Sequence, residues 1–146
     1  MDKALQVHAG EVYYMEFHGS QTVQNGWRPG IILQNEMGNR FSPNVIAIPL
    51  TSSLKKLDMP THVLLYAHKT GLQLDSIALC ENPECVPKSK IGTYITKLPR
   101  DSLEEVASAY LLATSAIAMV EPERLLGLWQ QATAMNSRFR KGVTHV

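Results

Sequence analysis

Residues 28–52, RPGIILQNEMGNRFSPNVIAIPLTS, contain the feature that most limits how this chain can fold. Two short apolar runs, 31–33 and 45–50, are rich in β-branched residues. Between them, residues 36–44 supply the Gly, Asn, Ser and Pro that turns require. This pattern predicts a strand, a loop and a second strand. We expect the strands to pair antiparallel, so that the start of the first lies beside the end of the second.

Paired in this way, the two strands bring Arg28 and Thr51 to one edge of the sheet. Arg28 lies between Trp27 and Pro29 at the start of the first strand. Thr51 and Ser52 end the second strand. A guanidinium group beside hydroxyl donors suits phosphate or carboxylate oxygens, because Arg can bind two such oxygens at once. The spacing therefore predicts an anion site at this edge.

The composition is that of an ordinary globular chain. Its 146 residues fit one domain that is large enough to bury a core. The net charge of +1 gives no overall basic field, so positive charge for a nucleic acid would have to be local. No apolar run approaches the ~18 residues of a membrane helix, and residues 1–9 lack the apolar core of a signal peptide. We therefore expect a cytoplasmic, reduced chain.

Short strands are expected in four further segments, where apolar residues alternate or cluster between turn residues. These segments are residues 11–17, 62–67, 76–80 and 91–98. Together with the two strands above and a long terminal helix, they predict a mainly antiparallel, strongly curved sheet.

Two helices are predicted towards the C-terminus. In the first, apolar residues recur with helical spacing over 103–118, Asp101 and Glu104 supply a capping-box-like start, and Pro122 ends the helix. The second, residues 123–135, has an apolar side that we expect to pack on the domain or on a partner. That side consists of Leu125, Leu128, Trp129, Ala132 and Met135.

The cysteines and histidines do not form a recognisable metal or acid–base motif. Cys80 and Cys85 have a C-x4-C spacing without the second Cys or His pair that structural zinc requires. We expect Cys80 to be a small buried side chain at a strand end. His62 and His68 have no neighbouring nucleophile or carboxylate motif, so surface or strand-end positions are expected. The sequence predicts no metal site and no cofactor.

Several motifs, taken in order, resemble those of the MazF/PemK family, small sequence-specific endoribonucleases of toxin–antitoxin pairs. The likeness extends from about residue 10 to residue 119, so we expect a toxin domain at 1–120 and a C-terminal helical extension with a basic tail at 121–146. The matching motifs are GEVYY at 10–14, Arg-Pro at 28–29, Gln-Asn at 34–35, the loop at 39–43, the ending at 49–52, PTHV at 60–63 and DSI at 75–77.

The resemblance implies an SH3-like curved antiparallel barrel, a homodimer and a cognate antitoxin peptide that occupies the RNA groove. It also implies metal-independent cleavage of single-stranded RNA (mRNA), which leaves 2′,3′-cyclic phosphate and 5′-hydroxyl ends. Arg28 and Thr51 match the family's catalytic positions. Arg28 would stabilise the developing phosphorane charge, and Thr51 would hydrogen-bond a non-bridging oxygen.

Six further residues are candidates for RNA binding. Two lie in the polar loop 18–26, two flank the catalytic pair, and two lie in 81–90, a segment that helps to line the RNA groove in the family. For Trp27 there are two readings, because its ring can stack a base, worth about 1–3 kcal/mol, or plug the core. The six are Thr22, Gln24, Trp27, Ser52, Asn82 and Lys88.

The general base is not identified from the sequence. Many family members carry a Glu in the loop before the Arg-Pro, whereas residues 21–24 here contain no carboxylate. Glu16 or Glu36 would be substitutes, or desolvation of the substrate would suffice. The alternative function is a non-catalytic toxin of the same fold, like the CcdB toxins that bind DNA gyrase. The presence of both Arg28 and Thr51 argues against that alternative.

Overall fold

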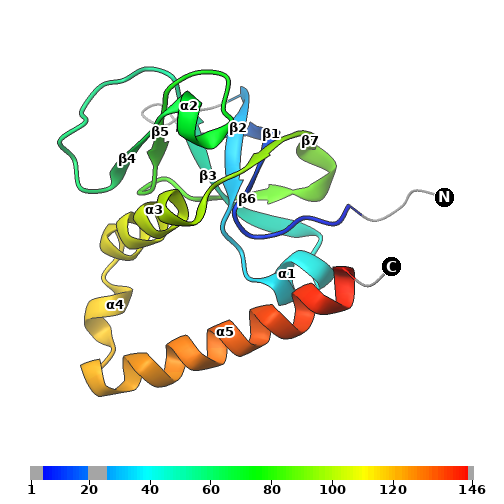
Figure 1. Ribbon diagram of the computed structural model, residues 1–146, viewed down its shortest axis with the longest axis vertical. Helices are drawn as coiled ribbons and strands as arrows, with labels where there is room; N and C mark the ends of the chain where they lie inside the picture. Colours follow the sequence, from blue (N-terminus) through cyan, green and yellow to red (C-terminus); the bar gives the residue numbers. More distant parts are fainter. Residues whose placement is uncertain (1–4, 20–25, 145–146) are drawn as a thin grey trace.

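The computed structural model describes residues 5–19 and 26–144, and within them a seven-stranded antiparallel sheet forms the body of the protein (Figure 1). The strands are β1 (Glu11–Phe17), β2 (Gly26–Ile32), β3 (Asn44–Thr51), β4 (His62–Leu65), β5 (Ser76–Leu79), β6 (Glu84–Pro87) and β7 (Ile91–Lys97). The helices are α1 (Glu36–Phe41), α2 (Ala67–Thr70), α3 (Arg100–Ala113), α4 (Ala116–Met119) and α5 (Pro122–Thr144), with a 3-10 turn η1 (Lys88–Lys90).

The strand order is β4-β5-β3-β2-β1-β7, and β6 also pairs with β3. Every pair is antiparallel, which confirms the predicted mainly antiparallel sheet. The sheet is open, since no strand pairing in the described part of the chain joins its outer strands, β4 and β7. No helix there has the length and apolar character needed to cross a bilayer.

The pairing of β2 with β3 follows the prediction. Gly30 lies opposite Pro49 and Ile31 lies opposite Ile48, and the same register continued outward places Arg28 opposite Thr51. The segment between the strands is helical, so the predicted loop at 36–44 is wrong. The side chain of Asn35 accepts a hydrogen bond from the Gly38 N–H at 2.8 Å, and this N-cap offsets the poor helix propensity of the turn residues.

Other element boundaries differ from those predicted because of local backbone chemistry. The predicted single helix at 103–118 is interrupted after α3, because the Thr114 hydroxyl accepts from the Ala116 N–H at 3.2 Å and competes with the helix. The predicted capping box is absent, since Asp101 lies inside the helix and accepts from the Ser102 N–H. Strand β6 was not predicted, although it pairs along β3 and buries Val86.

Two buried apolar clusters form the core. One contains Val12, Ile31 and Leu50 from the sheet, covered by Val106 and Ala109 of α3. It also contains Cys80, which is fully buried as predicted. The other cluster includes Met15, Phe17, Ile32, Val45 and Val86. The pair β2–β3 contributes to both clusters, so the backbone that carries Arg28 and Thr51 is held on two faces.

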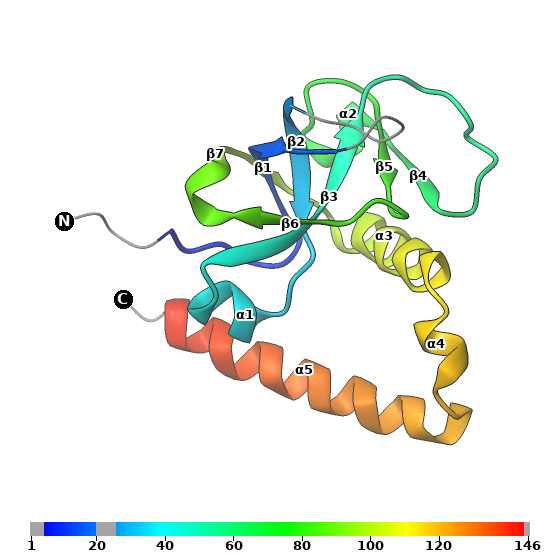
Figure 2. The ribbon, with the colours of Figure 1, turned by 180° about the vertical axis from the view of Figure 1, so that it is seen from behind.

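Helix α5 runs back beneath the sheet and reaches α1 at its C-terminal end (Figure 2). There Asn136 accepts from the Glu36 backbone N–H at 2.9 Å, and Arg140 lies 3.3 Å from the Glu36 carboxylate. Phe139 packs edge-on against Phe41. The predicted apolar side does not pack on the domain at Trp129, which is 64% exposed, so packing on a partner stays a prediction there. The helix also extends well past the predicted end at residue 135.

Candidate active site

Strands β2 and β3 place Arg28 and Thr51 in the wall of one pocket of about 460 Å³. The antiparallel pairing predicted for the two strands places Arg28 and Thr51 side by side in this way. Ser52 and Ser53 add hydroxyl groups to the pocket, while apolar side chains form much of the remaining wall. The apolar part consists of Pro29, Leu50, Leu72, Leu74 and Ile95.

The Arg28 side chain crosses to the neighbouring strand. Its Nη1 donates to the Leu50 carbonyl at 3.4 Å, which holds the guanidinium near Thr51. Burial lowers the pKa of Arg28, and the nearby Tyr14 hydroxyl acts in the opposite direction. A guanidinium nevertheless stays protonated near neutral pH. A guanidinium in the wall of a pocket can bind two oxygens of an anion at once, so the pocket suits a phosphate or carboxylate group.

Thr51 ends β3 and lines the pocket. Its Oγ1 accepts the Ser53 N–H at 3.1 Å, which occupies an oxygen lone pair and leaves the hydroxyl hydrogen for a ligand oxygen. Its main chain pairs with Ile77 of β5, so the residue is fixed by two neighbouring strands. Together Arg28 and Thr51 supply a cation and a donor directed at one small volume.

A second pocket of about 240 Å³ adjoins the first through Thr51 and Ser53. Lys55 and Lys56 line it, together with Asn82. These two lysines place positive charge locally, as binding to a nucleic acid would need in a chain whose net charge is only +1. The two pockets share Thr51 and Ser53 in their walls, and we call the two together the Arg28–Thr51 cleft.

His62 and Glu81 form a polar pair within the smaller pocket. His62 Nε2 lies 2.8 Å from the Glu81 carboxylate, and Nδ1 lies 3.0 Å from the Lys56 carbonyl. The two ring nitrogens of His62 therefore both contact oxygen atoms, which fixes the orientation of the imidazole. The expected strand-end position of His62 is confirmed, but its carboxylate partner was missed. Only the β4–β5 pairing, His62 opposite Leu79, brings the two together.

Trp27 is 45% exposed, so the core-plug reading is wrong. Its ring stacks on Tyr14 with the centroids 5.9 Å apart, and Tyr14 lines the larger pocket. An exposed aromatic pair beside a guanidinium is a stacking surface of the kind that single-stranded nucleic acids use.

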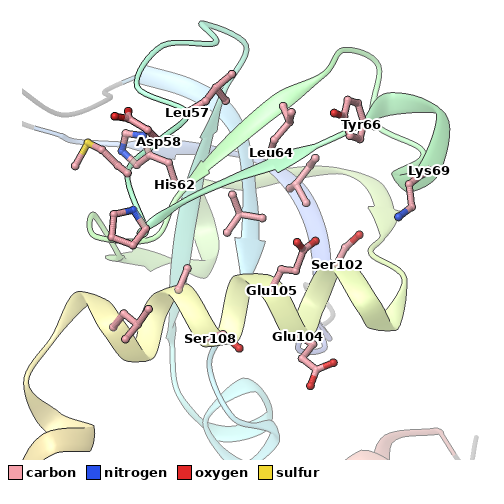
Figure 3. A pocket seen from close by; sticks show the side chains of 16 residues that line it. Leu57, Asp58, His62, Leu64, Tyr66, Lys69, Ser102, Glu104, Glu105 and Ser108 are labelled. Atoms are coloured by element: carbon pink, nitrogen blue, oxygen red, sulfur yellow. The ribbon is translucent and has the colours of Figure 1, made fainter.

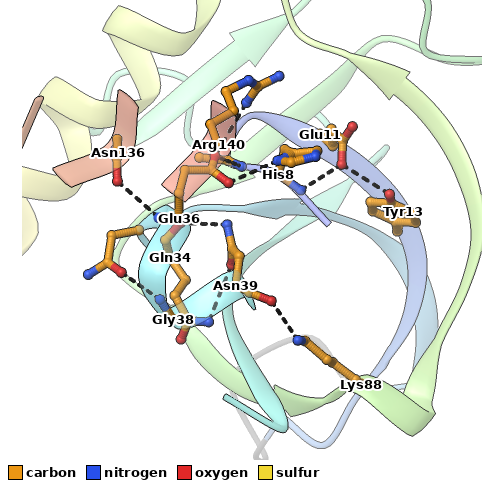
Figure 4. A network of polar contacts seen from close by, with 12 residues as sticks. His8, Glu11, Tyr13, Gln34, Glu36, Gly38, Asn39, Lys88, Asn136 and Arg140 are labelled. Carbon is orange, nitrogen blue, oxygen red and sulfur yellow. Dashed lines mark hydrogen bonds and ion pairs between the residues drawn. The ribbon is translucent and has the colours of Figure 1, made fainter. Parts of the chain in front are cut away.

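The remaining sequence candidates fall in different places. Ser52 lines the larger pocket and Asn82 the smaller one. Lys88 lines neither of these two pockets, since its Nζ donates to the Asn39 carbonyl in α1, so its role in RNA binding stays a prediction (Figure 4). Its match to the family was one of sequence position, which does not report where the side chain points. Thr22 and Gln24 lie outside the described residues.

Neither carboxylate suggested as a general base lines the Arg28–Thr51 cleft. Glu36 is 3% exposed and is bound by His8 and Arg140 on the α5 side of the molecule (Figure 4). Glu16 lies 3.4 Å from the Lys90 ammonium. Among the described residues, Glu81 is the one carboxylate in the wall of the cleft.

The two cysteines form no disulfide and differ in their exposure to solvent. Burial raises the pKa of the Cys80 thiol to about 12, whereas Cys85 is exposed. Over residues 5–19 and 26–144, no group of three or more His, Cys, Asp or Glu side chains is arranged to hold a metal ion.

Comparison with known proteins identifies the family. Residues 8–113 match the family described as PemK-like, MazF-like toxin of type II toxin–antitoxin system. The chain belongs to this toxin family. Endoribonuclease EndoA of Bacillus subtilis (strain 168) is 33% identical to it over 114 residues, which are 76% of this chain and 97% of that protein.

Solved structures of MazF proteins share the fold of this toxin. MazF from Deinococcus radiodurans superimposes with a TM-score of 0.65 at 22% identity, over 80% of this chain and all of that one. A MazE–MazF structure from the same organism has a TM-score of 0.59 at 22% identity, over 81% and 100% of the two chains. The whole Arg28–Thr51 cleft lies inside the matched residues 8–113, and α5 lies beyond them.

Proposed function

We propose that this toxin is a metal-independent endoribonuclease that cuts single-stranded RNA in the Arg28–Thr51 cleft. The observation that carries the proposal is the convergence of the Arg28 guanidinium and the Thr51 hydroxyl in one pocket. The relative of 33% identity is named an endoribonuclease, which supports the same activity. Trp27 and Tyr14 at the rim supply a stacking surface for bases, and Lys55 and Lys56 attract the phosphate backbone.

In the reaction, the 2′-hydroxyl oxygen attacks the adjacent phosphorus as its proton leaves, and the bond from phosphorus to the 5′-oxygen breaks. The products are a 2′,3′-cyclic phosphate and a 5′-hydroxyl. Arg28 stabilises the charge that develops on the phosphorane, and Thr51 donates to a non-bridging oxygen. Because burial lowers its pKa, Arg28 is also a better proton donor to the leaving 5′-oxygen than a solvated arginine.

We assign the removal of the 2′ proton to Glu81. Among the described residues it is the one carboxylate that lines the cleft. His62 holds its Oε2 at 2.8 Å, and its Oε1 is buried without a hydrogen-bond partner there. A positioned base of this kind typically contributes about 10²–10⁴-fold to the rate. His62 is then a positioning residue that sets the direction of the carboxylate.

The proposal extends to partners and location. Deinococcus radiodurans MazF is known in complex with MazE, and by analogy a cognate antitoxin holds this toxin inactive. An acidic disordered segment suits the positively charged Arg28–Thr51 cleft and folds as it binds. We further infer a homodimer, as the family implies, and a cytoplasmic location, where its RNA substrate is found. Residues 1–120 form the toxin domain and residues 121–146 an extension that cleavage does not need.

The decisive test incubates the full-length protein with a long single-stranded RNA in EDTA and maps the ends. We expect cuts that survive EDTA, with cyclic phosphate and 5′-hydroxyl ends. A matched RNA with deoxyribose at the scissile position should stay intact, because it lacks the nucleophile. Cutting of that control would refute the mechanism, and a folded protein that cuts neither RNA would favour the non-catalytic alternative.

A further inference from the structure

A larger groove, of about 810 Å³, lies between β4 and α3 and has no part in the proposed cleavage (Figure 3). Its floor is apolar and buried, formed by Val63, Leu65 and Ala109. More exposed apolar side chains from the segments on both sides of β4, from β4 itself and from α3 also line the groove. These are Leu57, Met59, Leu64, Tyr66 and Leu112.

Strand β4 is an outer strand of the sheet, so one side of its main chain pairs with no strand in the part of the chain that the structure describes. The Cys80 N–H donates to the Thr61 carbonyl at 3.0 Å, which fixes the alternation of the β4–β5 ladder. Val63 and Leu65 therefore bond to β5, and the N–H and C=O of Leu64 point to the outer edge. An outer edge of this kind is a template for an additional extended chain.

The charge of the groove is opposite to that of the Arg28–Thr51 cleft. Asp58, Glu104 and Glu105 line it and are exposed, and Figure 3 shows Glu105 projecting into the space beneath β4. Lys69, a cation at one end, already pairs with Asp101 at 3.3 Å, and the acceptors around His62 hold that imidazole. The net negative rim disfavours a phosphate backbone and favours a segment with lysine or arginine.

We propose that β4 and α3 form a docking site for an extended segment of a partner protein. The segment adds to β4 as a further strand through the Leu64 main chain. Alternate apolar side chains enter the floor between Val63 and Leu65, and basic side chains face Glu105, which projects from α3 toward β4 (Figure 3). This site is separate from the acidic antitoxin segment proposed for the cleft, and it does not depend on ribonuclease activity. Met59 and His62 line both hollows, so an occupant of the groove touches the wall of the cleft.

The probe for the test is an acetylated hexapeptide, Lys-Val-Lys-Val-Lys-Val amide, titrated into the full-length protein and followed by amide chemical shifts. We expect saturable shifts confined to 57–66 and to the α3 side of the groove. The double variant E104K/E105K should raise the Kd about tenfold, because it reverses the rim charge. The matched double variant E121K/E123K, at exposed positions before and within α5, should leave the Kd unchanged.

A second peptide with the same side chains but N-methylated on the edge facing β4 separates strand addition from charge attraction. It should lose most of the affinity, since it removes the main-chain donors. Equal binding of the methylated peptide, equal binding of a Glu-Val hexapeptide, or the absence of binding would overturn the proposal. Self-association of the protein that E104K/E105K abolishes would also overturn it, because the occupant would then be a second copy.

Discussion

Thr51→Val and Arg28→Lys separate the contributions of the two central residues. Valine keeps the size and β-branching of threonine, so it suits the end of β3. The Ser53 N–H loses its acceptor, but Ser53 is exposed and water replaces the bond. We therefore expect the free energy of unfolding to change by no more than about 0.5 kcal/mol.

The cost should appear in the chemical step instead. Removing one preorganised donor to a developing oxyanion typically costs about 2.7–4 kcal/mol, or about 10²–10³ in rate. For Arg28→Lys the charge stays, but the planar fork that binds two phosphate oxygens is lost. If Arg28 binds the transition state through both nitrogens, lysine should slow cleavage nearly as much as alanine. If only its charge matters, lysine should recover most of the rate.

The assay is the single-turnover rate on a short RNA, with affinity measured on the same RNA bearing deoxyribose at the scissile position. Rates should fall far more than affinity, because the lost contacts matter most in the transition state. Thr133→Val and Arg124→Lys make the same changes at exposed positions of α5 and should cut normally. Near-wild-type cleavage by Thr51→Val or by Arg28→Ala would show that the catalytic centre lies elsewhere.

Three further outcomes follow from the site. Glu81→Gln should slow single-turnover cleavage about 10²–10⁴-fold, as expected for loss of a general base; a rate within a fewfold of wild type would exclude Glu81 from that role. Trp27→Ala should weaken RNA binding by about 1–3 kcal/mol in a fluorescence titration, because its exposed ring loses base stacking; unchanged affinity would mean that RNA does not reach the ring. A chain ending at Glu121 should still cut RNA but unfold at lower urea, losing about 1–3 kcal/mol as Glu36 gives up its contacts with α5. If the shortened chain stayed folded yet inactive, α5 would belong to the catalytic unit.

The central geometry was predictable because it is local. Two β-branched runs with turn residues between them predict antiparallel pairing. The register of that pairing then sets Arg28 opposite Thr51. The buried role of Cys80 was predictable for the same reason, since it directly follows a strand of apolar residues. Neither inference needed to know how distant segments meet.

The missed features depend on contacts between distant parts of the chain. Helix α1 contains Gly38 and Asn39, which disfavour helix, and it is held by its cap and by α5 about a hundred residues later. The His62–Glu81 pair exists only once β4 lies beside β5. Strand β6 carries a proline at its end, where the missing N–H costs little, and composition alone cannot distinguish that from a proline in a loop.

The long return of α5 to α1 determines the order in which this molecule comes apart. The Glu36–Arg140 contact closes a chain segment of 104 residues and rests on few partners at the far end of an otherwise exposed helix. Closing so long a segment carries an entropic cost that local strand pairs avoid, so α5 docks after the sheet has formed. It also leaves first, because segments with few buried contacts open at free energies well below that of global unfolding. Amide hydrogens of α5 will therefore exchange before those of β2 and β3. Proteases will cleave within α4 and α5 while the Arg28–Thr51 cleft is still folded.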